Sequence, residues 1–261
     1  MKEKLTKKNQ SVEKIFQIIE AMAESSGPVR LQDLSQKVQY PASTTLRMLN
    51  TLLSYGYVNQ DVETSKYSLS MKFCKIGEAV KSQFSIRDLI RPYLHELSEK
   101  CQESACLAIE QDMTVVYIDV VEGPDKMLRT MQRIGKSAPL HSTGVGKLML
   151  VNYSQDQLEA FVQKRGLEPL TEKTITSLEA LRKELDKVKT NGIALDDEEC
   201  ETGARCVAAP IRDYTGKVVA GISVSGPTSR ITMERVVHIK GIILGIAGRA
   251  SNKLGFISSE L

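Results

Sequence analysis

The chain has 261 residues, a formal net charge of +3, 41% hydrophobic residues and 26% charged residues. This length is enough for two domains with cores of their own, and the composition excludes disordered and fibrous proteins. No apolar stretch reaches the roughly 18 residues that a membrane helix requires, so a membrane protein is not expected.

The N-terminal tail and the cysteines indicate a protein of the cytoplasm. Residues 1–10 are polar and rich in lysine, which predicts a flexible tail rather than a signal peptide. The five cysteines, at positions 74, 101, 106, 200 and 206, are an odd number in a chain of this size, so reduced thiols are predicted. Their spacing differs from that of zinc-binding pairs, and neither a metal site nor another cofactor is expected.

Three helices are predicted in the first part of the chain. Val12, Ile15, Phe16, Ile19 and Met22 recur at helical spacing, and the helix that they define ends before Gly27-Pro28. A second, shorter helix contains Leu31, Leu34 and Val38. After the break at Gln39-Tyr40-Pro41, a third helix over residues 43–54 carries Leu46, Leu49, Leu52 and Leu53, which we expect on its inner face.

The segment after the third helix predicts a hairpin. Tyr57-Val58 and Lys66-Tyr67 lie in two short strands around a polar turn, and Gly56 ends the helix before them. Three helices, with a short turn between the second and third, followed by a hairpin are typical of a winged helix-turn-helix that binds double-stranded DNA. The excess of positive charge agrees, since residues 1–75 hold 11 Lys/Arg against 7 Asp/Glu.

The start of the third helix supplies the candidate DNA contacts. Its short hydroxyls and one cation suit phosphates and base edges: Ser43, Thr44, Thr45 and Arg47, with Lys66 added from the wing. An alternative for Ser43 is that it serves only as the N-cap of the helix, with the threonines merely solvated.

A connecting helix follows the wing. Met71, Ile76 and Val80 share a helical face, and a second helix begins near Ser85. We therefore predict a DNA-binding domain over residues 11–75, a linker helix over 76–85 and a second domain over 86–261. The apolar face of the linker packs either on the same helix of a second chain or on its own domain.

The second domain is predicted to be α+β, with a central antiparallel sheet. Strands are expected over residues 105–110, 114–120, 128–134, 205–211 and 218–224. Helices are expected over 144–151, 155–164, 178–190 and 232–254, with a capping box at Ser154 and Gln157 and a stop at Asn191-Gly192.

Two segments of this domain carry possible chemistry. Gly144 and Gly146 open a helix, where free N–H groups suit an anion, although the same glycines also permit a tight turn and close packing. The acids at 196–199 read as a solvated loop rather than a metal site. Ser223 and Ser225 share one sheet face, either solvated or lining a polar pocket.

Several motifs resemble the IclR family of bacterial transcription regulators. In the first domain these are Ser11-Val12-Glu13-Lys14, Pro41-x-Ser43-Thr44-x-x-Arg47-x-Leu49, Leu53-x-x-Gly56-Tyr57-Val58 and Lys66-Tyr67-x-Leu69. The family usually has Lys or Arg where this chain has Ala42, and commonly His where it has Leu46. The resemblance continues with His-x-x-Gly-x-Gly-Lys from His141, Gly-x-Arg-Cys-x-Ala-x-Pro from Gly203 and Ser-x-Ser-Gly-Pro from Ser223, and it covers about residues 11–254.

The resemblance implies a GAF-like α/β effector-binding domain that binds a small organic acid or sugar acid. Its carboxylate would meet the N–H groups of Gly144 and Val145. The rest of the pocket would be lined by Asp196, Cys206, Ser223 and Ser225, with Thr130 and Ala138 closing a wall. The family has larger apolar residues at these last two positions, which implies a roomier or more polar pocket here.

We therefore expect a DNA-binding transcription regulator, a homodimer or homotetramer, whose operator binding a small carboxylate metabolite controls. Repression is the expected mode of action, and activation is the alternative. A second hypothesis is an enzyme or binding module with a winged helix that does not bind DNA. It would use Cys206 as the nucleophile and His141 as its base, but no sequence signal brings these two together.

Overall fold

The computed structural model describes residues 9–124 and 133–257. The chain divides into two compact units, Met1–Phe84 and Ser85–Leu261. Within the described ranges, no helix combines the length and the apolarity that crossing a bilayer requires.

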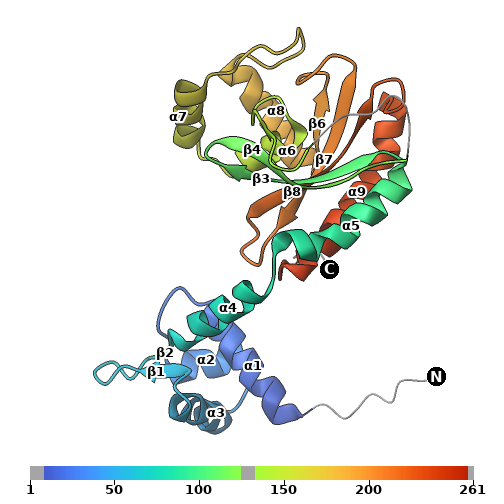
Figure 1. The fold of residues 1–261 in the computed structure, drawn as a ribbon. Coiled ribbons are helices and arrows are strands. Elements are labelled where there is room, and N and C mark those ends of the chain that lie inside the picture. The colour runs from blue at the N-terminus through green and yellow to red at the C-terminus, as the bar shows by residue number, and fades with distance from the viewer. Residues whose placement is uncertain (1–8, 125–132, 258–261) are drawn as a thin grey trace, which may run out of the picture. The chain divides into compact units, whose positions relative to one another are not determined.

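The first unit is the predicted winged helix-turn-helix (Figure 1). Its elements are α1 (Gln10–Ala23), α2 (Leu31–Lys37), α3 (Ala42–Ser54), β1 (Val58–Gln60), β2 (Tyr67–Leu69) and α4 (Lys72–Gln83). β1 and β2 pair antiparallel as the wing. Ile18, Leu34 and Leu49 are buried where the three helices meet, so the core of this unit comes from the apolar positions of α1, α2 and α3.

Helix α4 follows the wing and begins at Lys72, earlier than the linker helix that the sequence predicts. The ring of Phe73 packs on that of Tyr57, with centroids 5.1 Å apart, and Lys72 Nζ donates to the carbonyl oxygen of Tyr55 over 2.8 Å. None of the residues of α4 is buried, and Ile76 and Val80 are exposed. The described residues of this unit therefore leave the apolar face of α4 uncovered.

The second unit is built on an antiparallel sheet. Its strands are β3 (Ser104–Gln111), β4 (Thr114–Val121), β5 (Ser137–Ala138), β6 (Ala194–Asp197), β7 (Ala204–Arg212) and β8 (Val218–Pro227), in the order β5-β4-β3-β8-β7-β6. This confirms the predicted α+β class. The strand expected over residues 128–134 lies largely outside the described residues.

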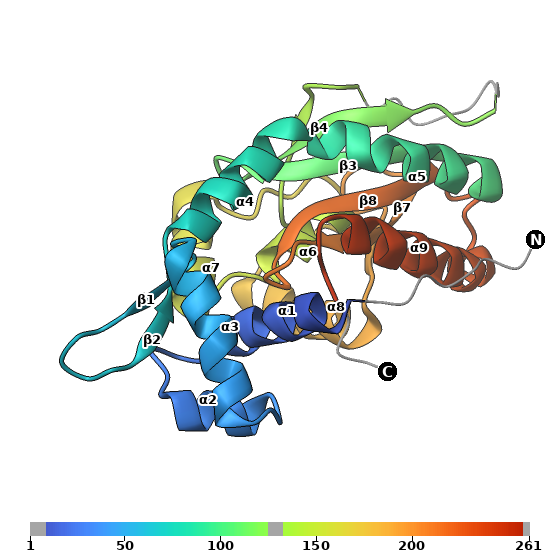
Figure 2. The ribbon, with the colours of Figure 1, turned by 90° about the horizontal axis from the view of Figure 1, so that it is seen from below.

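Helices cover both faces of this sheet, as Figures 1 and 2 show. α5 (Ile86–Cys101) and α9 (Met233–Lys253) lie together on one face, over a core that includes Leu94, Leu107 and Ile243. The opposite face carries α6 (Gly144–Leu150), α7 (Gln155–Arg165) and α8 (Leu178–Asn191). Both faces of the sheet are therefore buried under helices.

Local capping fixes the ends of these helices. The Ser154 side chain accepts from the N–H of Gln157, and the Gln157 side chain accepts from the N–H of Ser154, which confirms the predicted capping box. Gly192 follows α8 with φ = 72°, a left-handed conformation that favours glycine. The sequence signals at both positions are therefore satisfied as predicted.

Candidate functional site

The exposed face of α3 carries most of the predicted DNA contacts. Ser43 and Arg47 are exposed, and Thr44 is half-buried beside them. Pro41 occupies the N-cap position and no side chain caps this helix, so the interpretation of Ser43 as the N-cap is wrong. Ser43 lies in the first turn, where its hydroxyl faces solvent together with the guanidinium of Arg47.

Thr45 was assigned to the wrong face of α3. It is fully buried, and its hydroxyl donates to the carbonyl oxygen of Pro41 over 3.3 Å, which removes the cost of burying it. Conversely, Leu46, expected on the inner face, is 36% exposed. The buried positions of α3 are Thr45, Met48, Leu49 and Leu52, and the side chain of Thr45 is therefore not available to DNA.

Asn50 completes the exposed face and was missed from the sequence. It is exposed, and it lies three residues after Arg47 and seven after Ser43, which is one face of a helix. The spacing from Ser43 is the signal that would have found it. Lys66, the predicted contact of the wing, is half-buried just before β2 and on the same unit.

The second unit contains a cavity of about 240 Å³ between α6, the end of β6 and the sheet. Six of the predicted effector residues line it: Ala138, Gly144, Val145, Asp196, Cys206 and Ser225. Ser223 was also expected there but is not among the lining residues; it lies two residues earlier on β8, opposite Ala208. Thr130 lies outside the described residues.

Cross-strand register explains why these residues meet. Asp196 on β6 is paired with Cys206 on β7, and Cys206 is paired with Ser225 on β8. Directly paired residues share one face of a sheet, so the three side chains form a polar row under α6. The hydroxyl of Ser225 is buried and lies within hydrogen-bonding reach of the Cys206 thiol.

Other lining residues were not identified from the sequence. They are Tyr117, Lys136, Ser137, Pro139, Thr143, Cys200, Glu201, Ala204 and Arg205. Lys136 and Glu201 are exposed, whereas Arg205 is buried and donates from Nε to Asp197 Oδ1 over 2.7 Å. Tyr117 arrives from β4, far away in the sequence, and no local pattern marks it.

The two glycines at the start of α6 have different roles. A Cβ atom at Gly146 would lie 2.2 Å from the carbonyl oxygen of Leu140, so this glycine is required for close packing. The N–H of Gly146 donates to the hydroxyl of Thr143 over 3.1 Å. Gly144 and Val145 come at the start of the helix, where N–H groups lack intrahelical partners, and both line the cavity.

Asp196 is the buried carboxylate of the cavity. Its Oδ1 atom accepts from the N–H of Glu199 over 2.9 Å and from the N–H of Cys200 over 3.2 Å. Burial raises the pKa of Asp196 to about 6, against the opposing effects of these two N–H groups and of Lys147. A carboxyl group with this pKa changes its charge near neutral pH.

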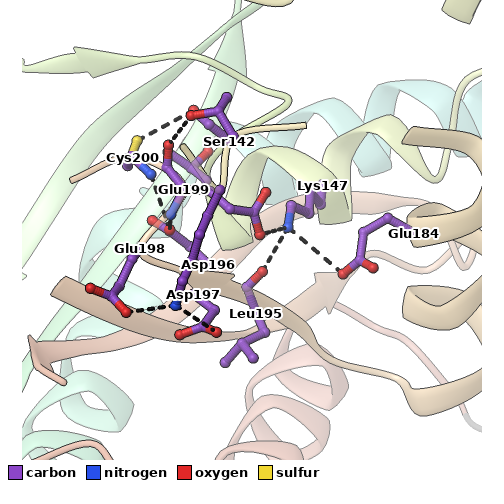
Figure 3. A network of polar contacts seen from close by, with 12 residues as sticks. Ser142, Lys147, Glu184, Leu195, Asp196, Asp197, Glu198, Glu199 and Cys200 are labelled. Atoms are coloured by element: carbon purple, nitrogen blue, oxygen red, sulfur yellow. Dashed lines mark hydrogen bonds and ion pairs between the residues drawn. The ribbon is translucent and has the colours of Figure 1, made fainter. Parts of the chain in front are cut away.

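Of the acids at 196–199, which are expected in a solvated loop, Asp196 and Glu199 are buried in a polar network, whereas Asp197 and Glu198 are half-buried beside Lys173 (Figure 3). Lys147 is fully buried and pairs with Glu199, while its Nζ atom lies 3.7 Å from Glu184 Oε1. The same Nζ donates to the carbonyl oxygen of Leu195 over 2.8 Å. Burial raises the pKa of Glu199 to about 7, because the attraction of Lys147 compensates only in part.

Outside the cavity, Lys173 pairs with Glu198 at 2.7 Å, so this segment is tied down on both sides. The network therefore fixes α6 against the turn that presents Asp196.

The thiols of the cavity are not activated. Burial raises the pKa of Cys206 to about 12 and that of Cys200 to about 11. His141 Nε2 hydrogen-bonds with the carbonyl oxygen of Glu168 at 3.1 Å. Over residues 9–124 and 133–257, no group of three or more His, Cys, Asp or Glu side chains is arranged to hold a metal ion. The arrangement suits the binding of a small molecule, and a nucleophilic thiolate is disfavoured.

Comparisons with known proteins match both units. The model of the IclR helix-turn-helix domain matches residues 11–62, and the model of the bacterial transcriptional regulator IclR C-terminal domain matches residues 78–252. The HTH-type transcriptional regulator KdgR of Escherichia coli is 36% identical over 249 residues, which is 94% of this chain and 93% of KdgR.

Two further similarities agree with these. The transcriptional repressor IclR of Escherichia coli is 32% identical over 91% of this chain and 87% of its own length. The crystal structure of the Thermotoga maritima IclR superposes with a TM-score of 0.63 at 30% identity, covering 94% of this chain and 99% of that one.

Proposed function

Because this chain belongs to the IclR family of bacterial transcriptional regulators, which bind DNA and are not enzymes, we propose that it is a repressor controlled by a small organic acid. Residues 11–75 would bind the operator and residues 86–261 the effector, with α4 joining the two parts. The enzyme hypothesis for Cys206 and His141 does not agree with the family.

DNA contact is assigned to the exposed face of α3 and to the wing. Ser43, Thr44, Arg47 and Asn50 would enter the major groove, where the guanidinium of Arg47 suits guanine, and Lys66 would contact phosphate. The exposed Arg47, without an ion-pair partner among the described residues, is the observation that carries this assignment. Mobility-shift assays on the DNA upstream of the gene test it; absence of sequence-specific binding at low salt contradicts it.

The effector is proposed to be a carboxylate metabolite in the cavity beneath α6. The N–H groups of Gly144 and Val145 would hold its carboxylate, and Asp196, Cys206 and Ser225 would contact the remainder, beside Ala138. The buried hydroxyl of Ser225, which lines the cavity, favours a ligand with polar groups, such as a sugar acid. Thermal-shift screening of pyruvate, D-gluconate and benzoate is the test, and a lack of stabilisation by any anionic metabolite contradicts the proposal.

Repression is favoured over activation because the similar Escherichia coli IclR is named a transcriptional repressor. A repressor leaves its operator when the effector binds the released form more tightly than the DNA-bound form. Titration of the effector into the protein–operator complex is therefore expected to release the DNA. Tighter operator binding in its presence would point to the other mode.

We assign the uncovered apolar face of α4 to a second copy of the chain. Ile76 and Val80 are 44% and 50% exposed on this helix. Apolar side chains gathered on one exposed face are typical of a surface that binds another protein chain. A homodimer, or a homotetramer made of two such dimers, would bind a pseudo-palindromic operator. Sedimentation of the full chain measures the assembly.

A further inference from the structure

The charges around the effector cavity do not balance for an anionic ligand. Among the residues that the structure describes, four charged side chains line the cavity: Lys136, Asp196, Glu201 and Arg205. Arg205 is paired with Asp197, which cancels its charge locally. One lysine and two carboxylates then remain among these described side chains, and their net charge is −1 when all are ionised. An entering carboxylate would add a second negative charge to a cavity of about 240 Å³.

One of the two carboxylates is suited to lose its charge. Glu201 is exposed, and water stabilises its ionised form. Asp196 is 8% exposed and lies in the polar row of the sheet, so its ionised form is poorly solvated. Like charges that share one site cannot both ionise easily, and the less solvated group takes the proton.

The hydrogen bonds of Asp196 decide which of its oxygens carries that proton. Oδ1 accepts two N–H groups, those of Glu199 and Cys200, and both donors require an oxygen lone pair. A proton on Oδ1 would compete with them. The proton therefore belongs on Oδ2, which is then a hydrogen-bond donor in the cavity that Asp196 lines.

Several other groups face Asp196 and set its response to pH. The positive charge of Lys147 on α6 lowers the pKa of Asp196, and the negative charge of Asp197, the next residue on β6, raises it. Glu199 and Cys200 lie in the turn that follows β6. Tyr117 on β4 and Cys206 on β7 stay protonated over the neutral range, because burial raises the pKa of each. Lys147 pairs with Glu199 and donates to the carbonyl oxygen of Leu195, so its charge is already compensated before an effector enters.

From this geometry we infer that the acidic effector enters the cavity together with one proton, and that Asp196 holds this proton on Oδ2 and donates it as a hydrogen bond to the effector carboxylate. The inference rests on the proposed function, since it requires an anionic effector. It makes Asp196 a donor in the bound state rather than an ionised acceptor. Effector affinity is then coupled to pH, and DNA release with it.

Calorimetry of the wild-type chain measures the proton directly. The acid from the panel of pyruvate, D-gluconate and benzoate that gives the largest thermal shift is titrated in buffers of different ionisation heat at about pH 7.5. All three acids are anions at this pH, since the pKa of a carboxyl group is about 4. The heat of binding is expected to vary with the ionisation heat of the buffer, with a slope that corresponds to close to one proton taken up. The Kd is expected to rise by about tenfold per pH unit above about pH 6.5.

The variant Asp196→Asn mimics the bound state. Its amide keeps an oxygen for the two N–H groups and presents an NH₂ donor where the protonated Oδ2 would be. We expect its Kd to be independent of pH within about twofold, and to be at least about tenfold lower than the wild-type Kd at pH 8.5. The matched control is Glu179→Gln, an exposed carboxylate on α8, which is expected to keep the wild-type pH slope.

The outcomes separate the two proposals. If no acid of the panel binds at any pH, the proposed function and this inference fail together. If an acid binds without buffer-dependent heat and Asp196→Asn weakens it at every pH, the effector site stands and the inference is overturned. Thermal unfolding of each variant without ligand establishes whether it is folded. If Asp196→Asn does not fold, the buffer dependence of the wild-type heat decides whether a proton is taken up.

Discussion

The ammonium group of Lys147 on α6 donates to the carbonyl oxygen of Leu195 on β6 over 2.8 Å, in a position that water does not reach. The same group pairs with Glu199, in the turn that follows β6. The helix over the cavity and the strand that presents Asp196 are thus joined by one buried cation.

Replacing Lys147 by methionine is expected to destabilise the second unit by about 3–5 kcal/mol, because the carboxylate of Glu199 would stay buried without its partner. Urea unfolding followed by circular dichroism measures this in a chain without tryptophan. The double variant Lys147→Met, Glu199→Gln removes the orphaned charge and should recover part of the loss. A loss below about 1 kcal/mol for the single variant would mean that the pair contributes little.

The close approach of α6 to Leu140 makes Gly146 intolerant of any side chain. Gly146→Ala is expected to cost about 3 kcal/mol of unfolding free energy, since its Cβ would lie 2.2 Å from a backbone oxygen. Gly241 in α9 is the control, because nothing lies within 4 Å of a Cβ built there. Gly241→Ala should stabilise by about 0.5–1 kcal/mol. Equal effects in the two variants would contradict the packing argument.

Arg47→Ala is expected to weaken specific operator binding by about 1–3 kcal/mol and to relax the preference for one base pair. Competition mobility shifts with operator and unrelated DNA give both quantities. Thr45→Val is the matched control on the same helix: the buried threonine should lose only stability, with sequence preference unchanged. A changed base preference in Thr45→Val, or an unchanged base preference in Arg47→Ala, would contradict the assignment of Arg47 to the DNA-binding face of α3 and of Thr45 to its buried face.

The thermal stability of the second unit should rise when the pH is lowered from about 7.5 to about 6.5. Burial raises the pKa of Glu199 to about 7 and that of Asp196 to about 6, above their ordinary values of 4.5 and 3.8. The folded state therefore binds more protons than the unfolded state, and stability is lost as the pH rises through these values.

Below about pH 6.5 an opposite effect begins, because burial lowers the pKa of His141 and its protonation then favours unfolding. Melting curves at several pH values test this, and Glu199→Gln should flatten the rise between about pH 7.5 and 6.5. A wild-type midpoint that falls over that interval would show that the sign is wrong.

Charges on the apolar face of α4 should prevent assembly. The double variant Ile76→Asp, Val80→Asp places two carboxylates where a second chain is proposed to pack, and monomers are expected in sedimentation velocity. Ser82→Asp adds a charge elsewhere on the same exposed helix and should leave the mass unchanged. If the double variant keeps the wild-type mass, another surface makes the assembly.

The sequence by itself determined most of the elements and the family, because these depend on local signals; the short strands β5 and β6 were not expected. Apolar spacing defined α1 and α2, and the Ser154 capping box and Gly192 defined the ends of α7 and α8. Each signal acts within one or two turns of the chain, where the backbone geometry is fixed by the residues themselves.

Only the tertiary structure decided which side chains meet. In α3 a threonine and a leucine exchange the faces that hydropathy assigns, because the Thr45 hydroxyl is satisfied within the helix and so can be buried. Lys147 and Glu199 are 52 residues apart, and Asp196, Cys206 and Ser225 meet only through strand register. Long-range pairing of this kind leaves no local trace, which is why two of the four acids expected in solvent, Asp196 and Glu199, are instead buried, the first beside the cavity and the second beside Lys147.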